Sequence, residues 1–141
     1  MSVPVAMGGF GKFVLLVSLL RSGGFDPTRN RGTNVGTMIR VSVLYPASAG
    51  ANFDWAYYTS QHIPLVNRLL GRALKGVSVA RGLGGEEPGS PAPFVAMADL
   101  RFESIESFQA AIGPHLEAIN ADILNYTSIM PVVQISEIIA T

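Results

Sequence analysis

Two kinds of hydrophobic repeat alternate along the last three quarters of the chain, and their order limits the possible fold more than any other feature. Two long segments, which begin after Asp54 and Ser104, place apolar residues three and four positions apart, and this spacing predicts amphipathic helices. Four short segments rich in valine, isoleucine and aromatic residues are predicted strands: 39–45, 74–81, 94–102 and 129–139. The predicted order is therefore strand, helix, strand, strand, helix, strand.

Each predicted helix has a recognisable start and an internal break. Asp54 and Ser104 are expected N-caps, because their side-chain oxygens accept hydrogen bonds from the first-turn amides. Gly71 suits the end of the first helix. Pro64 and Pro114 lie inside the helices and remove a backbone donor, so we expect a kink at each. The apolar stripes are Trp55, Tyr58, His62, Leu65, Val66 and Leu69, and then Ile105, Phe108, Ile112, Leu116 and Ile119.

This order predicts an α+β, ferredoxin-like βαββαβ fold, in which both helices cover one face of a four-stranded antiparallel sheet. The other face would be uncovered. In the third strand it carries Val95 and Met97 beside Asp99 and Arg101, and in the fourth strand it carries either Met130 and Val132 or Val133 and Ile135. Because an exposed apolar sheet face usually has a partner, we expect a homodimer in which two sheets pack face to face as a dimeric α/β barrel.

Residues 1–37 differ from the predicted domain at 38–141. They hold seven of the 15 glycines, carry a net charge of +3, and contain one apolar run, Phe13 to Leu20. Eight residues are far short of the ~20 that span a bilayer. Arg21 follows the run and no A-x-A cleavage site appears, so a signal peptide fits poorly. We expect a disordered or misassigned extension before Met38, no membrane span, and a cytoplasmic location.

The composition excludes several classes of function. The chain has no cysteine and only two histidines, so it lacks a disulfide framework, a thiolate zinc site and a thiol nucleophile, and a histidine-rich metal site is not expected. Its net charge is zero, which gives no electrostatic footprint for nucleic acid. From these counts and this net charge we expect no metal and no nucleic-acid partner. Charged residues make up 14% of the chain, against a usual value of about 25%, so little polar surface is available and burial against a partner is expected.

His62 is the strongest candidate for chemistry, because it lies near the centre of the apolar stripe of the first helix. One interpretation is a structural histidine that is hydrogen-bonded to an otherwise unpaired group. The other is a general acid or base in a cleft between helix and sheet. Tyr58, one turn earlier, would share that pocket, whereas Tyr57 lies about 100° away around the helix and is expected to be peripheral. Tyr45 ends the first strand.

Three other polar residues are assigned no catalytic role. His115 lies on the flank of the second helical stripe, and the neighbouring Pro114 gives a structural reason for a polar side chain there. Asp99 and Arg101 are expected either at the interface between sheets or lining the barrel, and their opposite charges allow pairing across the dimer.

Five stretches of the chain resemble the EthD family. They are VSVLYP (41–46), FDWAYYTSQHIPLV (53–66), LLGRALKGVSVARGL (69–83), SFQAAIGPH (107–115) and DILNYTSIMPVVQISE (122–137). The resemblance implies a dimeric α/β barrel from bacterial catabolic or secondary metabolism. The family takes its name from a gene cluster for ethyl tert-butyl ether degradation, beside a monooxygenase system. Many relatives with this barrel work on hydrophobic carbonyl compounds without a tightly bound cofactor. The histidine of the H-x-P-L block corresponds to His62.

These observations predict a small protein that binds a hydrophobic carbonyl or aromatic compound. It would act as a cofactor-free isomerase, cyclase or lyase with His62 as general acid or base. The expected ligand-binding residues are Tyr45, Trp55, Tyr58, Asn125 and Tyr126. The alternative is a non-catalytic ligand-binding or accessory protein of a monooxygenase system, and a weaker one is haem binding through His62 or His115. The sequence leaves open whether the protein is an enzyme.

Overall fold

The computed structural model describes residues 38–141, so the expectation for residues 1–37 lies outside the described part. The strands are β1 (Ile39–Pro46), β2 (Gly76–Arg81), β3 (Phe94–Phe102) and β4 (Val132–Glu137). The helices are α2 (Trp55–Tyr57), α3 (Ile63–Leu70), α4 (Ile105–Ile112) and α5 (Leu116–Ile123). None of the helices in the described part combines the length and apolar character that a membrane crossing needs.

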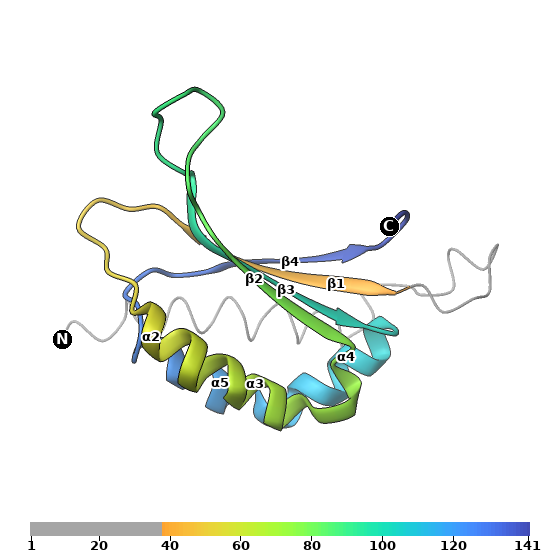
Figure 1. Cartoon of the computed structure of the whole chain (residues 1–141). Helices are drawn as coiled ribbons and strands as arrows, with labels where there is room; N and C mark the ends of the chain where they lie inside the picture. The colour runs from red at the N-terminus through yellow and green to blue at the C-terminus, as the bar shows by residue number, and fades with distance from the viewer. Residues whose placement is uncertain (1–37) are drawn as a thin grey trace.

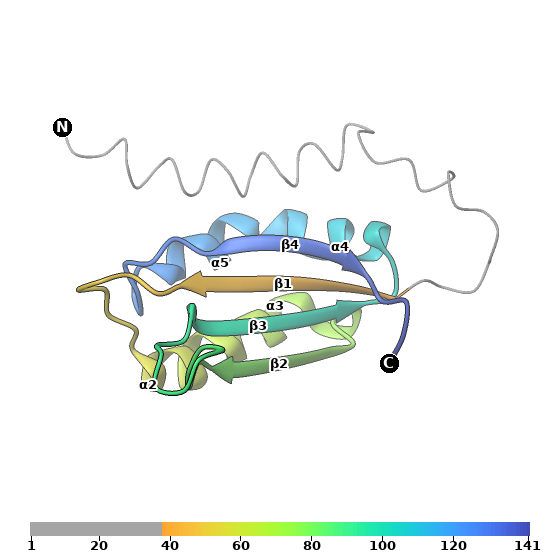
Figure 2. The same ribbon diagram turned by 90° about the horizontal axis from the view of Figure 1, so that it is seen from above.

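The four strands form one antiparallel sheet in the order β2-β3-β1-β4. In its central rows Val41 of β1 lies opposite Leu100 of β3 and Ile135 of β4. All the helices of residues 38–141 pack on one face, and no helix or strand of this part covers the opposite face, which is called the open face below (Figure 1). Figure 2, turned by 90°, shows the sheet from above, with the helices behind it. The predicted ferredoxin-like α+β fold is confirmed.

Both predicted breaks in the helices occur, but as changes of winding. Before Pro64, residues Tyr58–His62 form a π-helical turn, in which the amide of Ile63 donates to the carbonyl of Tyr58. Pro64 then lies in the first turn of α3, where a missing amide donor costs little. At Pro114, the 3₁₀ turn Gly113–His115 separates α4 from α5. The N-caps Asp54 and Ser104 each accept a hydrogen bond as predicted.

Two predicted strands were too long. β4 begins at Val132 rather than residue 129, because Pro131 has no amide to donate and the amide of Ile129 donates to the side chain of Thr127 instead. β2 begins at Gly76 rather than residue 74, since the amide of Leu74 donates to the carbonyl of Gly71 in the 3₁₀ turn Gly71–Ala73.

The core divides into two clusters beneath the sheet. The aliphatic cluster joins β1 and β3 to α3, α4 and α5 and contains Ile39, Val41, Val66, Leu70, Phe102, Phe108, Ile112, Leu116 and Ile119. The aromatic cluster lies at the other end of β1 and contains Tyr45, Tyr58, Ala96, Tyr126 and Ile129. The aliphatic cluster follows the predicted stripe of the second helix, but in the first helix it contains Leu70, which lay outside the predicted stripe. The aromatic cluster contains three of the residues that the sequence singled out for function, Tyr45, Tyr58 and Tyr126.

The open face of the sheet is apolar at one end and polar at the other. Val133 and Ile135 pack against the helices, which leaves Met130 and Val132 exposed on the other side of the chain. Leu44, Met97 and Val132 share one cross-strand row. The next row holds Asp99, which accepts a hydrogen bond from Ser42 at 2.7 Å and lies 3.6 Å from the guanidinium of Arg40.

Candidate active site

His62, which is buried, and Asp122, which is partly buried, form a hydrogen-bonded pair between the first helical segment (α2 to α3) and the second (α4 to α5). His62 ends the π turn that precedes α3, and Asp122 lies near the end of α5. The Nδ1 atom of His62 is 2.9 Å from Oδ2 of Asp122, and His62 is 5% exposed. A carboxylate in this position accepts the Nδ1 hydrogen, so the hydrogen bond assigns the neutral tautomer whose Nε2 lone pair is free.

Asp122 accepts hydrogen bonds from three side chains. The hydroxyl of Tyr57 donates to Oδ1 at 2.6 Å, and Nδ2 of Asn125 donates to the same oxygen at 3.0 Å. Desolvation by burial alone would raise the pKa of Asp122, but the bonds from Tyr57, Asn125 and His62 outweigh it and lower the pKa. The carboxylate is therefore ionised at neutral pH.

Burial determines the protonation of His62. Desolvation lowers the pKa of His62 from its ordinary value, and the hydrogen bond and negative charge of Asp122 oppose this shift only in part. The imidazole is therefore neutral at neutral pH, and the pair combines an uncharged base with an ionised carboxylate that orients it. This is the arrangement that a general base requires.

Aromatic rings enclose His62. Tyr58 stacks on the imidazole with ring centroids 5.6 Å apart, and the centroid of Tyr126 is 4.6 Å away. The hydroxyls of Tyr126 and Tyr45 are 2.7 Å apart. Burial raises the pKa of Tyr45 to about 12 and raises the pKa of Tyr58 and of Tyr126 as well. All three hydroxyls therefore stay protonated and can donate.

Trp55 lies at the rim of the aromatic cluster. Its ring is 4.6 Å from that of Phe53 and 5.9 Å from that of Tyr58. The guanidinium of Arg81, at the end of β2, lies 4.5 Å from its ring centroid in a cation–π contact. Trp55 thus borders the predicted site and contacts it through Tyr58.

The structure brings the predicted site residues together but fills the predicted cleft. Tyr45, Tyr58 and Tyr126 are each at most 2% exposed and pack with His62 between helix and sheet. The space that we expected to be a cleft is therefore occupied by side chains. Asn125 takes part through Asp122 rather than by facing the sheet.

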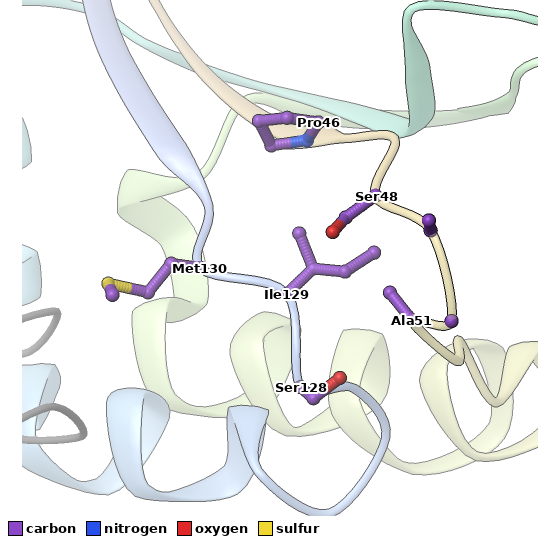
Figure 3. Close-up of a pocket in the computed structure, with 8 residues that line it drawn as sticks. Pro46, Ser48, Ala51, Ser128, Ile129 and Met130 are labelled. Carbon is purple, nitrogen blue, oxygen red and sulfur yellow. The ribbon is translucent and has the colours of Figure 1, made fainter.

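An open hollow adjoins this cluster at the end of the sheet. Its volume is about 400 Å³. It is lined by Pro46, Ser48, Ala49, Gly50, Ala51, Ser128, Ile129 and Met130 (Figure 3). Two loops form its walls, and two hydrogen bonds hold them together. The amide of Asp54 donates to the carbonyl of Tyr126, and the hydroxyl of Thr127 donates to the backbone carbonyl of Asn52.

Sequence reasoning missed Asp122 and misplaced Tyr57. Tyr57 is half-buried and bonded to Asp122, not peripheral, because α5 packs beside the flank of the first helix that carries it. The angle around one helix says nothing about the position of the next. The proximity of Asp122 to Asn125 in the DILNYT stretch was the one available signal.

The other polar candidates lie elsewhere. His115 precedes α5, at the opposite end of that helix from Asp122. Asp99 and Arg101 lie on the open face of the sheet, where Asp99 pairs within its own chain with Ser42 and Arg40. Within residues 38–141 no three histidine, aspartate or glutamate side chains are grouped so as to hold a metal ion.

Comparison with known proteins gives a consistent match. The EthD domain matches residues 50–129. The crystal structure of an EthD-like protein from Ralstonia eutropha JMP134 is 46% identical, covers 74% of this chain and 94% of its own, and superposes with a TM-score of 0.71. An ethyl tert-butyl ether D (EthD) family protein from Bacillus halodurans C-125 is 21% identical, covers 72% and 99%, and has a TM-score of 0.57. No curated protein gave a significant match.

Proposed function

The chain belongs to the EthD family, and we propose that it binds a small hydrophobic carbonyl or aromatic compound and moves a proton on it without a cofactor. The reaction class would be isomerisation, cyclisation or lyase chemistry in bacterial catabolic or secondary metabolism. The observation that carries this proposal is the His62–Asp122 hydrogen bond, 2.9 Å long and enclosed by aromatic rings.

His62 would act through Nε2. Asp122 holds the hydrogen on Nδ1 and fixes the ring, so the Nε2 lone pair can take a proton from the carbon next to a ligand carbonyl. The C–H electron pair then forms a C=C bond, and the π pair of the carbonyl moves to its oxygen, which gives an enolate. The protonated hydroxyls of Tyr45 and Tyr126 are the nearby donors for that oxygen. Return of the proton from Nε2 to another atom of the ligand completes an isomerisation.

Proton transfer can be tested with a simple ketone. In D₂O, the protein should accelerate loss of the α-proton NMR signal of acetophenone, a one-ring aromatic ketone. His62→Gln should lower the protein-dependent rate by about 10²- to 10⁴-fold, the usual value of general acid–base catalysis. Tyr57→Phe keeps His62 and Asp122 and serves as the milder comparison. Equal rates for wild type and His62→Gln would exclude His62 as the base.

The proposal includes a homodimer. The open face of the sheet holds the apolar row Leu44, Met97 and Val132 beside an arginine- and aspartate-containing polar end. A second copy turned about a two-fold axis offers the same apolar row and both signs of charge, so the face is complementary to itself. Packing of two such sheets would form the barrel.

A non-catalytic ligand-binding or accessory role in a monooxygenase system is the second candidate. One observation favours it: no ionisable side chain lines the hollow, and His62 is buried and is not among the lining residues. Native mass spectrometry of the purified protein, first mild and then strongly activating, separates the two candidates. A retained organic molecule that the protein leaves chemically unchanged on prolonged incubation would support the binding role, and conversion of that molecule would support the enzyme.

A further inference from the structure

Ile129 belongs both to the open hollow and to the buried aromatic cluster. It lines the hollow with Ser48, Ala51 and Met130, and Figure 3 shows its side chain in the middle of them. The same side chain packs with Tyr45 and Tyr126 and is 7% exposed. Ile129 therefore stands between solvent and the tyrosine cluster on this side, next to the smaller Ala51, which also lines the hollow and packs on the cluster.

The backbone that carries Ile129 is firmly held. Its amide donates to Oγ1 of Thr127 at 3.1 Å, and the hydroxyl of Thr127 donates to the carbonyl of Asn52 at 2.7 Å. Phe53 and Thr127 also form an isolated β-bridge. Because the main chain is tied to both walls of the hollow, the size of the side chain at residue 129 decides how much space lies behind it.

The groups behind Ile129 suit a carbonyl oxygen. The hydroxyls of Tyr45 and Tyr126 bond to each other at 2.7 Å. This bond uses one of their two hydrogens, so the other hydrogen is free to donate. In front of Ile129, a hollow of about 400 Å³ lies within the range that holds small ligands.

We propose that Ile129 is the specificity-determining gate of this protein: its volume decides how large a hydrophobic carbonyl compound can pass from the hollow to the tyrosine hydroxyls. This inference rests on the proposed function, because it assigns a route and a size limit to the same ligand. It concerns Ile129 alone and requires no change in the role of His62.

The gate can be tested with two aromatic ketones that differ by one ring, acetophenone and 2-acetonaphthone. Trp55, the single tryptophan, lies at the rim of the same cluster and reports binding by its fluorescence. Ile129→Ala should shift the ratio of the two Kd values at least about tenfold toward the two-ring ketone, since even one methylene of pocket space discriminates 10- to 200-fold. Leu70→Ala, a deletion of equal size in the aliphatic cluster, should leave the ratio unchanged.

A second measurement needs no ligand. Ile129→Ala should increase nitration of Tyr45 and Tyr126 by tetranitromethane several-fold, read by peptide mass spectrometry, and Leu70→Ala should not. A Kd ratio within threefold of wild type would overturn the gate and leave the proposed function standing. If no variant binds either ketone, the proposed function fails, and the gate, as a size limit on that ligand, is overturned with it even where nitration rises. If nitration does not rise, or rises equally in Leu70→Ala, the gate is overturned.

Discussion

The Nδ1 atom of His62 and the Oδ2 atom of Asp122 meet at 2.9 Å although 60 positions separate them in the chain. The contact depends on the π turn at Tyr58–His62 on one side and on α5 on the other. The carboxylate is itself held by Tyr57 and Asn125. The pair thus connects the π turn before α3 to α5, so its loss should lower both the stability and the reactivity of the protein.

Asp122→Asn is the first prediction that follows. The asparagine amide carries no charge and does not fix the Nδ1 tautomer of His62. The α-proton exchange rate should therefore fall by at least about 10²-fold, since changes of this kind cost up to about 10⁴-fold. The free energy of unfolding in urea should fall by about 1.5–3 kcal/mol, the value of hydrogen bonds to a charged group. Glu117→Gln, an exposed change on the same helix, is the control. Retention of the full exchange rate in Asp122→Asn would contradict the orienting role.

The pH dependence of stability is the second prediction. The folded pKa of His62 is below its ordinary value of 6.5, so on acidification the unfolded chain binds a proton before the folded chain does. Stability is therefore complete above about pH 6.5 and declines below it. The lowered pKa of Asp122 acts in the same direction at more acidic pH. In urea titrations from pH 8 to pH 5, wild type should lose stability and His62→Gln should lose less. Parallel curves for the two proteins would refute the prediction.

The fold could be predicted because its evidence is local. The alternation along β1 and β3, the N-caps Asp54 and Ser104, and the helical stripes are each set by residues close together in the chain. Short-range periodicity decides which face of an element is buried. Errors occurred where a single bond ends an element, as at Ile129, whose amide donates to Thr127 and leaves the ladder.

The candidate site was predicted only in part, because its contacts are long-range. Tyr45, Tyr58, His62 and Tyr126 were chosen for their residue types and positions, and they do lie together. Asp122 was missed because it lies 60 positions from His62 in the chain, and its proximity to Asn125 in the DILNYT stretch does not show that α5 packs against the π turn. The expected cleft between helix and sheet was wrong, because the buried side chains of the four chosen residues fill that space.

The tyrosine hydroxyl pair gives the third prediction. Tyr45→Phe or Tyr126→Phe should each destabilise the protein by about 1–3 kcal/mol, since each leaves a buried hydroxyl without its 2.7 Å partner. The double variant should cost less than the sum of the two, because neither hydroxyl then remains unpaired. A double-mutant cycle from urea unfolding measures this coupling. Strict additivity would mean that the pair does not interact in solution.

The last prediction concerns the open face of the sheet. Met97 is 41% exposed and lies in the register between Leu44 and Ala80, at the centre of the apolar row. If two copies pack through this face, Met97→Glu places two carboxylates in a dry interface, and the dimer should dissociate into 15.0 kDa protomers with the fold retained. Leu124→Glu is the matched control, since Leu124 is 61% exposed at the end of α5, away from the sheet. Sedimentation equilibrium at micromolar concentration distinguishes the species. A monomeric wild type, or a Met97→Glu variant that stays dimeric, would rule out pairing through this face.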